Sequence, residues 1–288
     1  MAFEVPAHFA DQFTTNVELL LQQTVPMMLE GVMVASYTGS KSAQVVKQFG
    51  EVEFQTKTSR NADTLFSEID HKQRWIFPTD FSLALPVDTE DEIRMLNSPV
   101  SSYATAMRAA WARKVNTVIV DALLGTAKTG ENGGTSTSFP AGQTVASGST
   151  GLTVTKLRTA LEMLDGDEND PNDKKYFAMT AKQRTDLLET TEVTSSDYNT
   201  VKALVNGDVD EFLGFKFMRN QKLGVDGASA RRCIAWVKSG CVYGQWNGLT
   251  TKIGERPDKE YLTQVFMAGT NGAARTQELK VVEVLCAE

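Results

Sequence analysis

The chain has 288 residues, of which 41% are hydrophobic and 23% are charged, so it can form a sizeable core and is not expected to be disordered. Its net charge of -7 and its acidic pI argue against a dedicated nucleic-acid-binding protein, which would carry a basic patch or a high pI. The N-terminus lacks the pattern of a signal peptide, and no apolar stretch reaches the roughly 18 residues of a membrane span. We therefore expect a soluble protein that acts where it is made.

The first part of the chain changes its hydrophobic pattern near residue 40. Residues 11–37 carry apolar side chains mostly three or four positions apart, which predicts helix, and Pro26 is expected to divide it in two. Apolar and polar residues then alternate near 45–54 and near 75–85, which predicts two strand-like arms. The segment between them is mostly polar, and a polar segment of this length inside a compact domain is usually functional.

The clearest predicted element is a long helix over 98–124. Ser98 is a favourable N-cap, Pro99 suits the first helical position, and Gly125 is a natural C-cap. Apolar residues recur at helical spacing throughout, and Met107 and Trp111 are expected on its buried face. At 1.5 Å per residue the helix would be roughly 40 Å long.

The rest of the chain is predicted to alternate short helices and strands. Residues 126–151 are rich in Gly, Ser and Thr and predict a surface loop. A turn is expected at Gly269–Gly272 within a strand-rich end that covers 250–285. The other predicted elements are helices at 154–164, 181–188 and 195–205, and strands at 176–179, 211–218 and 233–237.

The residue types that carry catalysis are few and scattered. The two histidines, His8 and His71, have no neighbouring nucleophile or metal-ligand set in the sequence. The run GTAKTGENGG resembles a phosphate-binding loop only superficially, because Glu131 follows Gly130 where the loop needs a lysine. The three cysteines are widely spaced and predict reduced thiols rather than a disulfide framework or a zinc site. No catalytic residue, cofactor site or metal site is predicted.

One acidic segment leaves an alternative open. Asp165, Asp167 and Asn169 begin a calcium-loop pattern, but Asp170 replaces its glycine and Tyr176 replaces its bidentate acid. The pattern favours an acidic turn after a helix, and a weak surface cation site over 165–173 stays open.

The order of the predicted elements is more informative than any single motif. A terminal arm, a two-stranded loop, a long capped helix, a mixed α/β region and a strand-rich end follow one another. This order resembles the major capsid proteins of tailed bacteriophages, which share the Hong Kong 97-type fold with encapsulins. The stretch VDEFLGFKFMRNQKL, around Gly214, looks like a common stretch of the axial domain of that fold, and RRCIAWVKSGCVYG and TQELKVVEVL look like its later strands. The resemblance covers nearly the whole chain.

The resemblance implies an α+β, Hong Kong 97-like capsid fold with five parts. These are an N-terminal arm (1–40), an extended loop (41–87), a peripheral domain (88–170) with its spine helix at 98–124, an axial domain (171–250) and strands that return to both domains (251–288).

The same resemblance implies a structural protein, not an enzyme, that assembles itself into an icosahedral shell around phage double-stranded DNA. The implied partners are further copies in hexamers and pentamers, a portal, a separate scaffolding protein, decoration proteins where they occur, and DNA bound without sequence specificity. Because the arm begins almost at Met1, a separate scaffolding protein is expected rather than a cleaved extension. The expected location is the virion capsid after synthesis in the host cytoplasm, with no cofactor and no membrane. An encapsulin-type shell or another virion component is the alternative.

The polar segment of the extended loop is the predicted contact site between subunits. It mixes charges of both signs with a few apolar residues that cannot fold a core alone. An arm that lies across a neighbour would pair these charges and cover these apolar side chains, and each contact would be repeated by symmetry. The candidate contact residues are Lys57, Arg60, Leu65, Phe66, Glu68, Ile69 and Arg74.

Overall fold

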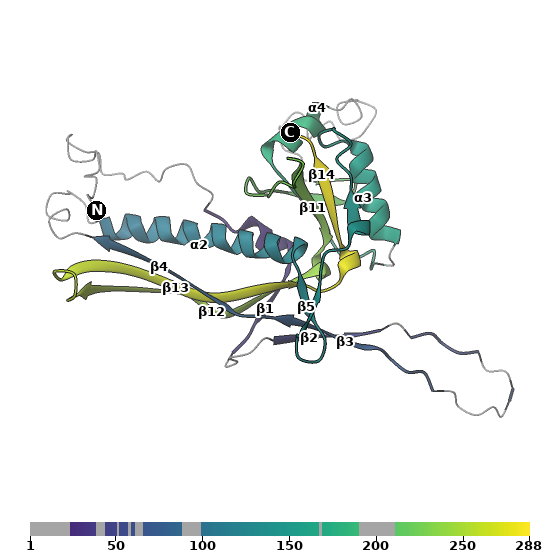
Figure 1. The fold of residues 1–288 in the computed structure, drawn as a ribbon, viewed down its shortest axis with the longest axis horizontal. Helices are drawn as coiled ribbons and strands as arrows, with labels where there is room; N and C mark the ends of the chain where they lie inside the picture. Colours follow the sequence, from purple (N-terminus) through teal and green to yellow (C-terminus); the bar gives the residue numbers. More distant parts are fainter. Residues whose placement is uncertain are drawn as a thin grey trace.

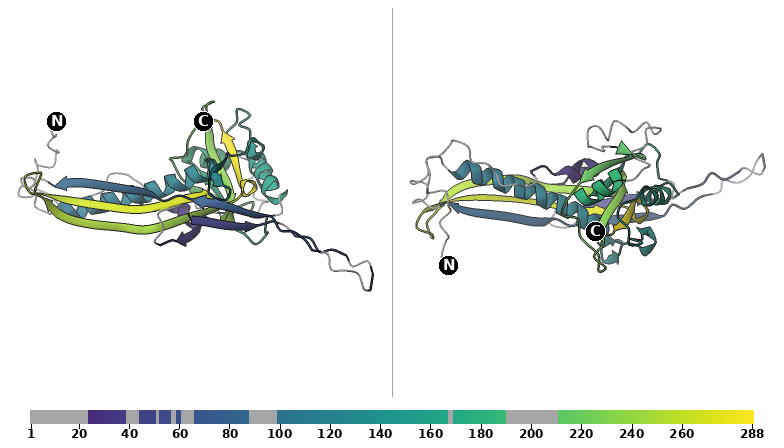
Figure 2. Two further views of the ribbon diagram at one scale, coloured as in Figure 1. Left: turned by 60° about the horizontal axis from the view of Figure 1, so that its bottom comes forward. Right: turned by 90° about the horizontal axis from the view of Figure 1, so that it is seen from above.

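The computed structural model describes residues 24–38, 44–50, 52–56, 59–60, 66–87, 99–166, 169–189 and 211–288. These residues form a mixed α+β molecule with a rounded body, a long arm and an extended loop (Figure 1). The arm and the loop leave the region of the body in opposite directions, and all three views agree on this (Figure 2). None of the described helices is long and apolar enough to cross a membrane.

The body is a mixed sheet of six strands packed against α3 (Val154–Gly166), with α4 (Ala181–Glu189) beside it. The central strands are almost wholly apolar on both faces, as expected for buried strands. Their side chains Phe177, Phe215 and Trp236 are fully buried and form the centre of the main core. The strands, in order across the sheet, are β7 (Thr144–Val145), β14 (Val281–Cys286), β11 (Arg231–Val237), β8 (Lys175–Met179), β10 (Phe215–Arg219) and β9 (Glu211–Phe212).

The arm consists of α2 (Pro99–Leu124) lying along a four-stranded sheet (Figure 1). Met107 is 1% exposed, so the apolar stripe of the helix does face the sheet, whereas Trp111 is only half-buried. Trp111 packs on Gly269, where an added Cβ would lie 2.5 Å from the indole ring. The strands, in order, are β1 (Met33–Ser36), β12 (Cys241–Arg256), β13 (Leu262–Arg275) and β4 (Thr79–Val87).

The extended loop leaves from a second, smaller four-stranded sheet. Its two arms are β2 and β3, and the chain that leaves the end of α2 returns as a hairpin, β5 and β6, beside β3. The loop hairpin continues past the paired strands through a hydrogen bond from the Gly50 amide to the Asp70 carbonyl, 2.7 Å. The strands, in order, are β2 (Gln44–Phe49), β3 (His71–Ile76), β5 (Ala127–Thr129) and β6 (Thr135–Thr137).

The structure corrects four sequence predictions. Residues 33–36 are strand β1 rather than helix, because they pair in parallel with β12. Residues 126–151 are not only loop, since they include β5, β6 and β7. Residues 79–87 are not an arm of the loop, because β4 pairs with β13. The helix predicted at 195–205 lies outside the described residues.

The fourth correction concerns Gly269–Gly272, which lie inside the continuous strand β13 and do not form a turn. These glycines are required by close packing, because a Cβ on Gly272 would lie 2.3 Å from the Phe77 carbonyl oxygen. The turn between β12 and β13 lies instead at 257–261, where Glu260 and Tyr261 adopt positive φ angles of 52° and 56°. Gly269 and Gly272 therefore mark positions where other groups approach the backbone closely, and not a reversal of the chain direction.

Candidate subunit-contact site

The described part of the loop carries several large apolar side chains that are exposed to solvent. Phe66 is 92% exposed and Ile69 is 42% exposed, while Arg60 and Glu68 are also exposed. The structure therefore places these four predicted contact residues on the free surface of the projecting loop. Lys57 and Leu65 lie outside the described residues.

Two further aromatic residues of the loop, outside the predicted contact residues, are also exposed. Phe54 is fully exposed, and Phe49 is 68% exposed and packs edge-on against His71. Both belong to the alternating pattern of the first predicted arm, so the pattern alone gave no reason to place them outside a core. Burial of such side chains on a neighbouring copy would remove a large apolar area from water.

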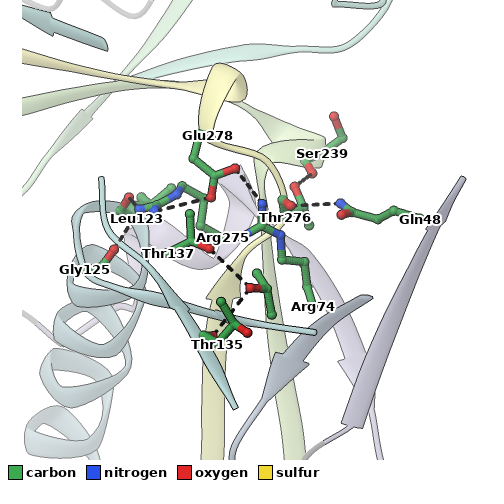
Figure 3. Close-up of polar contacts among 11 residues, drawn as sticks. Gln48, Arg74, Leu123, Gly125, Thr135, Thr137, Ser239, Arg275, Thr276 and Glu278 are labelled. Carbon is green, nitrogen blue, oxygen red and sulfur yellow. Dashed lines mark hydrogen bonds and ion pairs between the residues drawn. The ribbon is translucent and has the colours of Figure 1, made fainter. Parts of the chain in front are cut away.

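Arg74, the remaining candidate, lies at the base of the loop and is only 8% exposed. Its Nη2 donates to Oε2 of Glu278 at 2.5 Å, so its guanidinium pairs within the same chain. The structure thus separates Arg74 from the exposed candidates. It belongs to a junction where the loop, the end of α2 and the segment that follows β13 meet (Figure 3).

Arg275 is the centre of this junction and is fully buried. Its Nη1 donates to the carbonyl oxygens of Leu123 at 2.7 Å and Gly125 at 2.8 Å, which satisfies backbone acceptors at the end of α2. Its guanidinium also lies over the Phe139 ring, 5.2 Å from the centroid. Burial lowers the pKa of Arg275, and the nearby Glu278 carboxylate opposes this shift. A single arginine in the strand pattern gave no sequence signal for this role.

Further contacts tie the base of the loop to its surroundings. The Gln48 amide donates to the Thr276 carbonyl at 2.8 Å, and the Thr276 hydroxyl donates to the Ser239 carbonyl at 2.7 Å. The Trp75 indole donates to the Gly130 carbonyl at 2.6 Å, which holds the β5–β6 hairpin against β3. The loop is therefore joined to the body through side chains as well as through the backbone.

A shallow apolar groove lies on the arm between α2 and β4, with a volume of about 210 Å³. Phe81, Leu83 and Trp111 contribute to its wall, and Lys114 Nζ lies 4.5 Å from the Phe81 ring centroid at its edge. Leu83 is 40% exposed, so part of this apolar wall is open. The arm that carries the groove and the extended loop point in opposite directions in the same chain (Figure 2).

Groups with catalytic potential do not gather in the described part of the chain. No group of three or more His, Cys, Asp or Glu side chains that could hold a metal ion occurs among the described residues. Cys233, Cys241 and Cys286 are fully buried free thiols, and burial raises the pKa of Cys241 to about 12. In the acidic segment near 165–173, Asp165 pairs with Lys175, and Asp170 Oδ1 accepts a hydrogen bond from the backbone N–H of Asn172 at 2.9 Å.

The elongated α+β architecture, with a long helix, a projecting loop and exposed apolar side chains on that loop, is that of the Hong Kong 97-type capsid fold. A family model described as phage capsid protein matches residues 5–288. The chain belongs to this phage capsid protein family. It is a structural capsid protein of a phage shell.

Solved phage capsids share this fold at low sequence identity. The capsid of cyanophage Pam1 has a TM-score of 0.74 at 8% identity, covering 99% of this chain and 98% of that chain. The capsid of cyanophage P-SCSP1u has a TM-score of 0.73 at 14% identity, covering 97% and 93%. The capsid of Ralstonia phage GP4 has a TM-score of 0.71 at 10% identity, covering 99% and 96%. No curated protein sequence matches the chain.

Proposed function

We propose that copies of this chain assemble into an icosahedral shell around phage double-stranded DNA, with the extended loop of each subunit lying across a neighbour. The observation that carries this proposal is the loop itself. Phe54 and Phe66 are almost entirely exposed, and the extended loop projects away from the body (Figure 2). Large exposed apolar side chains mark interaction sites, and symmetry repeats each contact many times. The subunit would act without catalysis and without a cofactor.

The parts of the molecule have proposed places in such a shell. The body, built on the six-stranded sheet, would form the axial domain at the centre of each hexamer or pentamer. The arm, built on α2, would form the peripheral domain. Helix α3 packs on β11 and β14, so residues 154–166 lie with the body.

The net charge of -7 supports a container for DNA rather than a DNA-binding protein. Strong attraction between the wall and the packaged polymer would oppose both packing and release. Sequence-specific contacts with DNA are not part of the proposal. A portal, a separate scaffolding protein and decoration proteins are proposed partners, and the virion capsid is the proposed location after synthesis in the host cytoplasm.

Replacement of residues 56–73 by a short Gly-Ser turn tests the role of the loop. We expect a folded subunit by circular dichroism, because the body, the arm and half of the β2–β3 ladder, from Gln44–Ile76 to Val46–Arg74, lie outside the replaced residues. Sedimentation and electron microscopy should show that it forms closed shells far less well than the parent. A matched control shortens the exposed turn at 257–261 between β12 and β13. Normal shells from the loop deletion would contradict the proposed contact.

A further inference from the structure

Glu278 lies between two buried arginines that belong to different parts of the molecule (Figure 3). We propose that Glu278 is a two-position latch for the extended loop. In the position described here it binds Arg74 and holds the base of the loop to the body. In a second position it binds Arg275 alone, and the Arg74 side chain and the loop arms beyond it are released.

The two carboxylate oxygens of Glu278 make contacts of unequal length, and the longer contact, to Arg275, defines the second position. Oε2 accepts a hydrogen bond from Arg74 at 2.5 Å, whereas Oε1 lies 3.6 Å from Nη2 of Arg275. Neither Oε1 of Glu278 nor Nη2 of Arg275 has a hydrogen-bond partner within the described residues. A small rotation of the carboxylate toward Arg275 would satisfy both atoms.

The cluster holds two positive charges and one negative charge. Two guanidinium groups with side-chain exposures of 10% and 0% share one carboxylate. A buried charge is costly unless it is paired and hydrogen-bonded, so each arginine competes for Glu278. The bond lost at Arg74 in the second position is replaced by one gained at Arg275.

The three side chains differ in how firmly their surroundings hold them. Arg275 is fixed by two carbonyl oxygens at the end of α2 and by the Phe139 ring. Glu278 begins a short 3-10 segment, η5 (Glu278–Lys280), which follows the end of β13. Arg74 lies on β3, which pairs with the edge strand β2 on one side and, through Arg74 and Trp75, with β5 on the other. Release of the ion pair would therefore move the loop arms beyond Arg74 rather than the body.

The same region contains a buried anchor for β3 and a second side-chain hydrogen bond that joins the loop arms to the body. Ile76, at the end of β3, is fully buried in a small core with Val242 and Ala274. The hydrogen bond from Gln48 to the Thr276 carbonyl is the other side-chain tie from the loop arms to this segment among the described residues. The loop would swing about the β3–β5 pairing at Arg74 and Trp75 while Gln48 retains one contact. If the loop crosses a neighbour as proposed above, the latch sets the angle at which it does so.

The test measures the orientation of the loop in the unassembled full-length subunit. Spin labels are attached to cysteines introduced at two exposed positions, Glu68→Cys on the loop and Glu162→Cys on α3, since the native cysteines are fully buried. Pulsed electron resonance then gives the distribution of distances between the labels. The parent should give one narrow maximum. Glu278→Gln and Arg74→Met should each produce a second maximum or at least double the width.

A control and a folding check make the result decisive. Arg231→Met removes an ion pair with Glu288 in the body and should leave the loop distance unchanged. Circular dichroism establishes which variants are folded, and Glu278→Gln decides alone if Arg74→Met does not fold. The latch is refuted if folded Glu278→Gln keeps the parent distribution. It is equally refuted if the Arg231→Met control broadens the distribution as much. Because no assembly is measured, failure of the latch is distinct from failure of the proposed function.

Discussion

The indole nitrogen of Trp236 donates a hydrogen bond of 2.7 Å to the carbonyl oxygen of Gly31. Trp236 is fully buried on β11 in the body, and Gly31 ends η2 (Met27–Gly31), more than 200 residues earlier in the chain. This contact fixes the path by which the N-terminal segment reaches β1. Gly31 is required there because an added Cβ would lie 2.8 Å from the indole ring.

Trp236→Phe should lower the free energy of unfolding by about 1–3 kcal/mol, because it leaves the buried Gly31 carbonyl without its donor. Urea denaturation followed by circular dichroism measures this change. Trp246→Phe is the matched control, since Trp246 Nε1 is buried without a partner in the described structure and no hydrogen bond is lost. An equal cost for both substitutions would show that the Gly31 contact is not stabilising.

Trp111→Ala should destabilise the subunit by about 3 kcal/mol, the lower end of the range for large aromatic residues, because the side chain is only half-buried. Gly269→Ala should cost about 1–3 kcal/mol by pushing a methyl group into the Trp111 ring. Denaturant midpoints report both effects, and Phe66→Ala on the exposed loop serves as the control with no expected change. A denaturation midpoint for Trp111→Ala equal to that of the parent would contradict the packing of this helix face in the core of the arm.

Glu288 gives the stability of the body a defined dependence on acid. The pKa of Glu288 is lowered from 4.5 to about 2. The largest cause is the pair of hydrogen bonds that Arg231 donates to its carboxylate, and the next is a hydrogen bond from Gln183. A folded-state pKa below the unfolded value means that the stabilisation is present above about pH 4.5 and is lost as the pH falls toward 2. The side chain is 27% exposed, so the effect should be only about 0–1 kcal/mol.

Glu288→Gln tests this dependence by urea denaturation at pH 6 and pH 3. The variant should be less stable than the parent at pH 6, and the difference should shrink at pH 3. Glu260→Gln, an exposed carboxylate in the turn between β12 and β13, controls for the general loss of charge. A difference between parent and Glu288→Gln that stays constant or grows toward pH 3 would contradict the assignment.

The double substitution Phe66→Ser and Ile69→Ser should leave the subunit folded with a parent-like melting temperature, since both side chains are exposed. Its apparent assembly constant should fall about tenfold or more per contact, as expected from a loss of about 1.4 kcal/mol. Light scattering follows assembly, and Val225→Ser, an exposed apolar residue of the body, is the control. Parent-like assembly of the double variant would exclude these two side chains from the contact.

The sequence predicted the elements whose signals are local. The long helix ends at Leu124 as expected from Gly125, and the predicted strands at 176–179 and 233–237 lie within β8 and β11. The predictions failed where tertiary pairing overrides local preference, as in β1 and in the separation of β4 from the loop. They failed at Gly269 because a glycine that admits an indole ring has the same sequence signal as a turn glycine.

The candidate site was predictable to a similar extent. Exposure of Phe66 and Ile69 followed from an apolar minority in a long polar segment that cannot form a core. The junction of Arg74, Arg275 and Glu278 was not predictable, because its members lie up to 204 positions apart and show no common pattern. Such a cluster depends on the folded path of three separate segments.

Cryo-electron microscopy of purified phage particles that contain this chain tests the central proposal most directly. We predict a closed shell in which the chain repeats over the whole surface, with density for residues 66–70 of each copy against a neighbouring copy. Density for the chain confined to the tail or to a single vertex, or a shell whose loops contact no neighbour, would contradict the proposal.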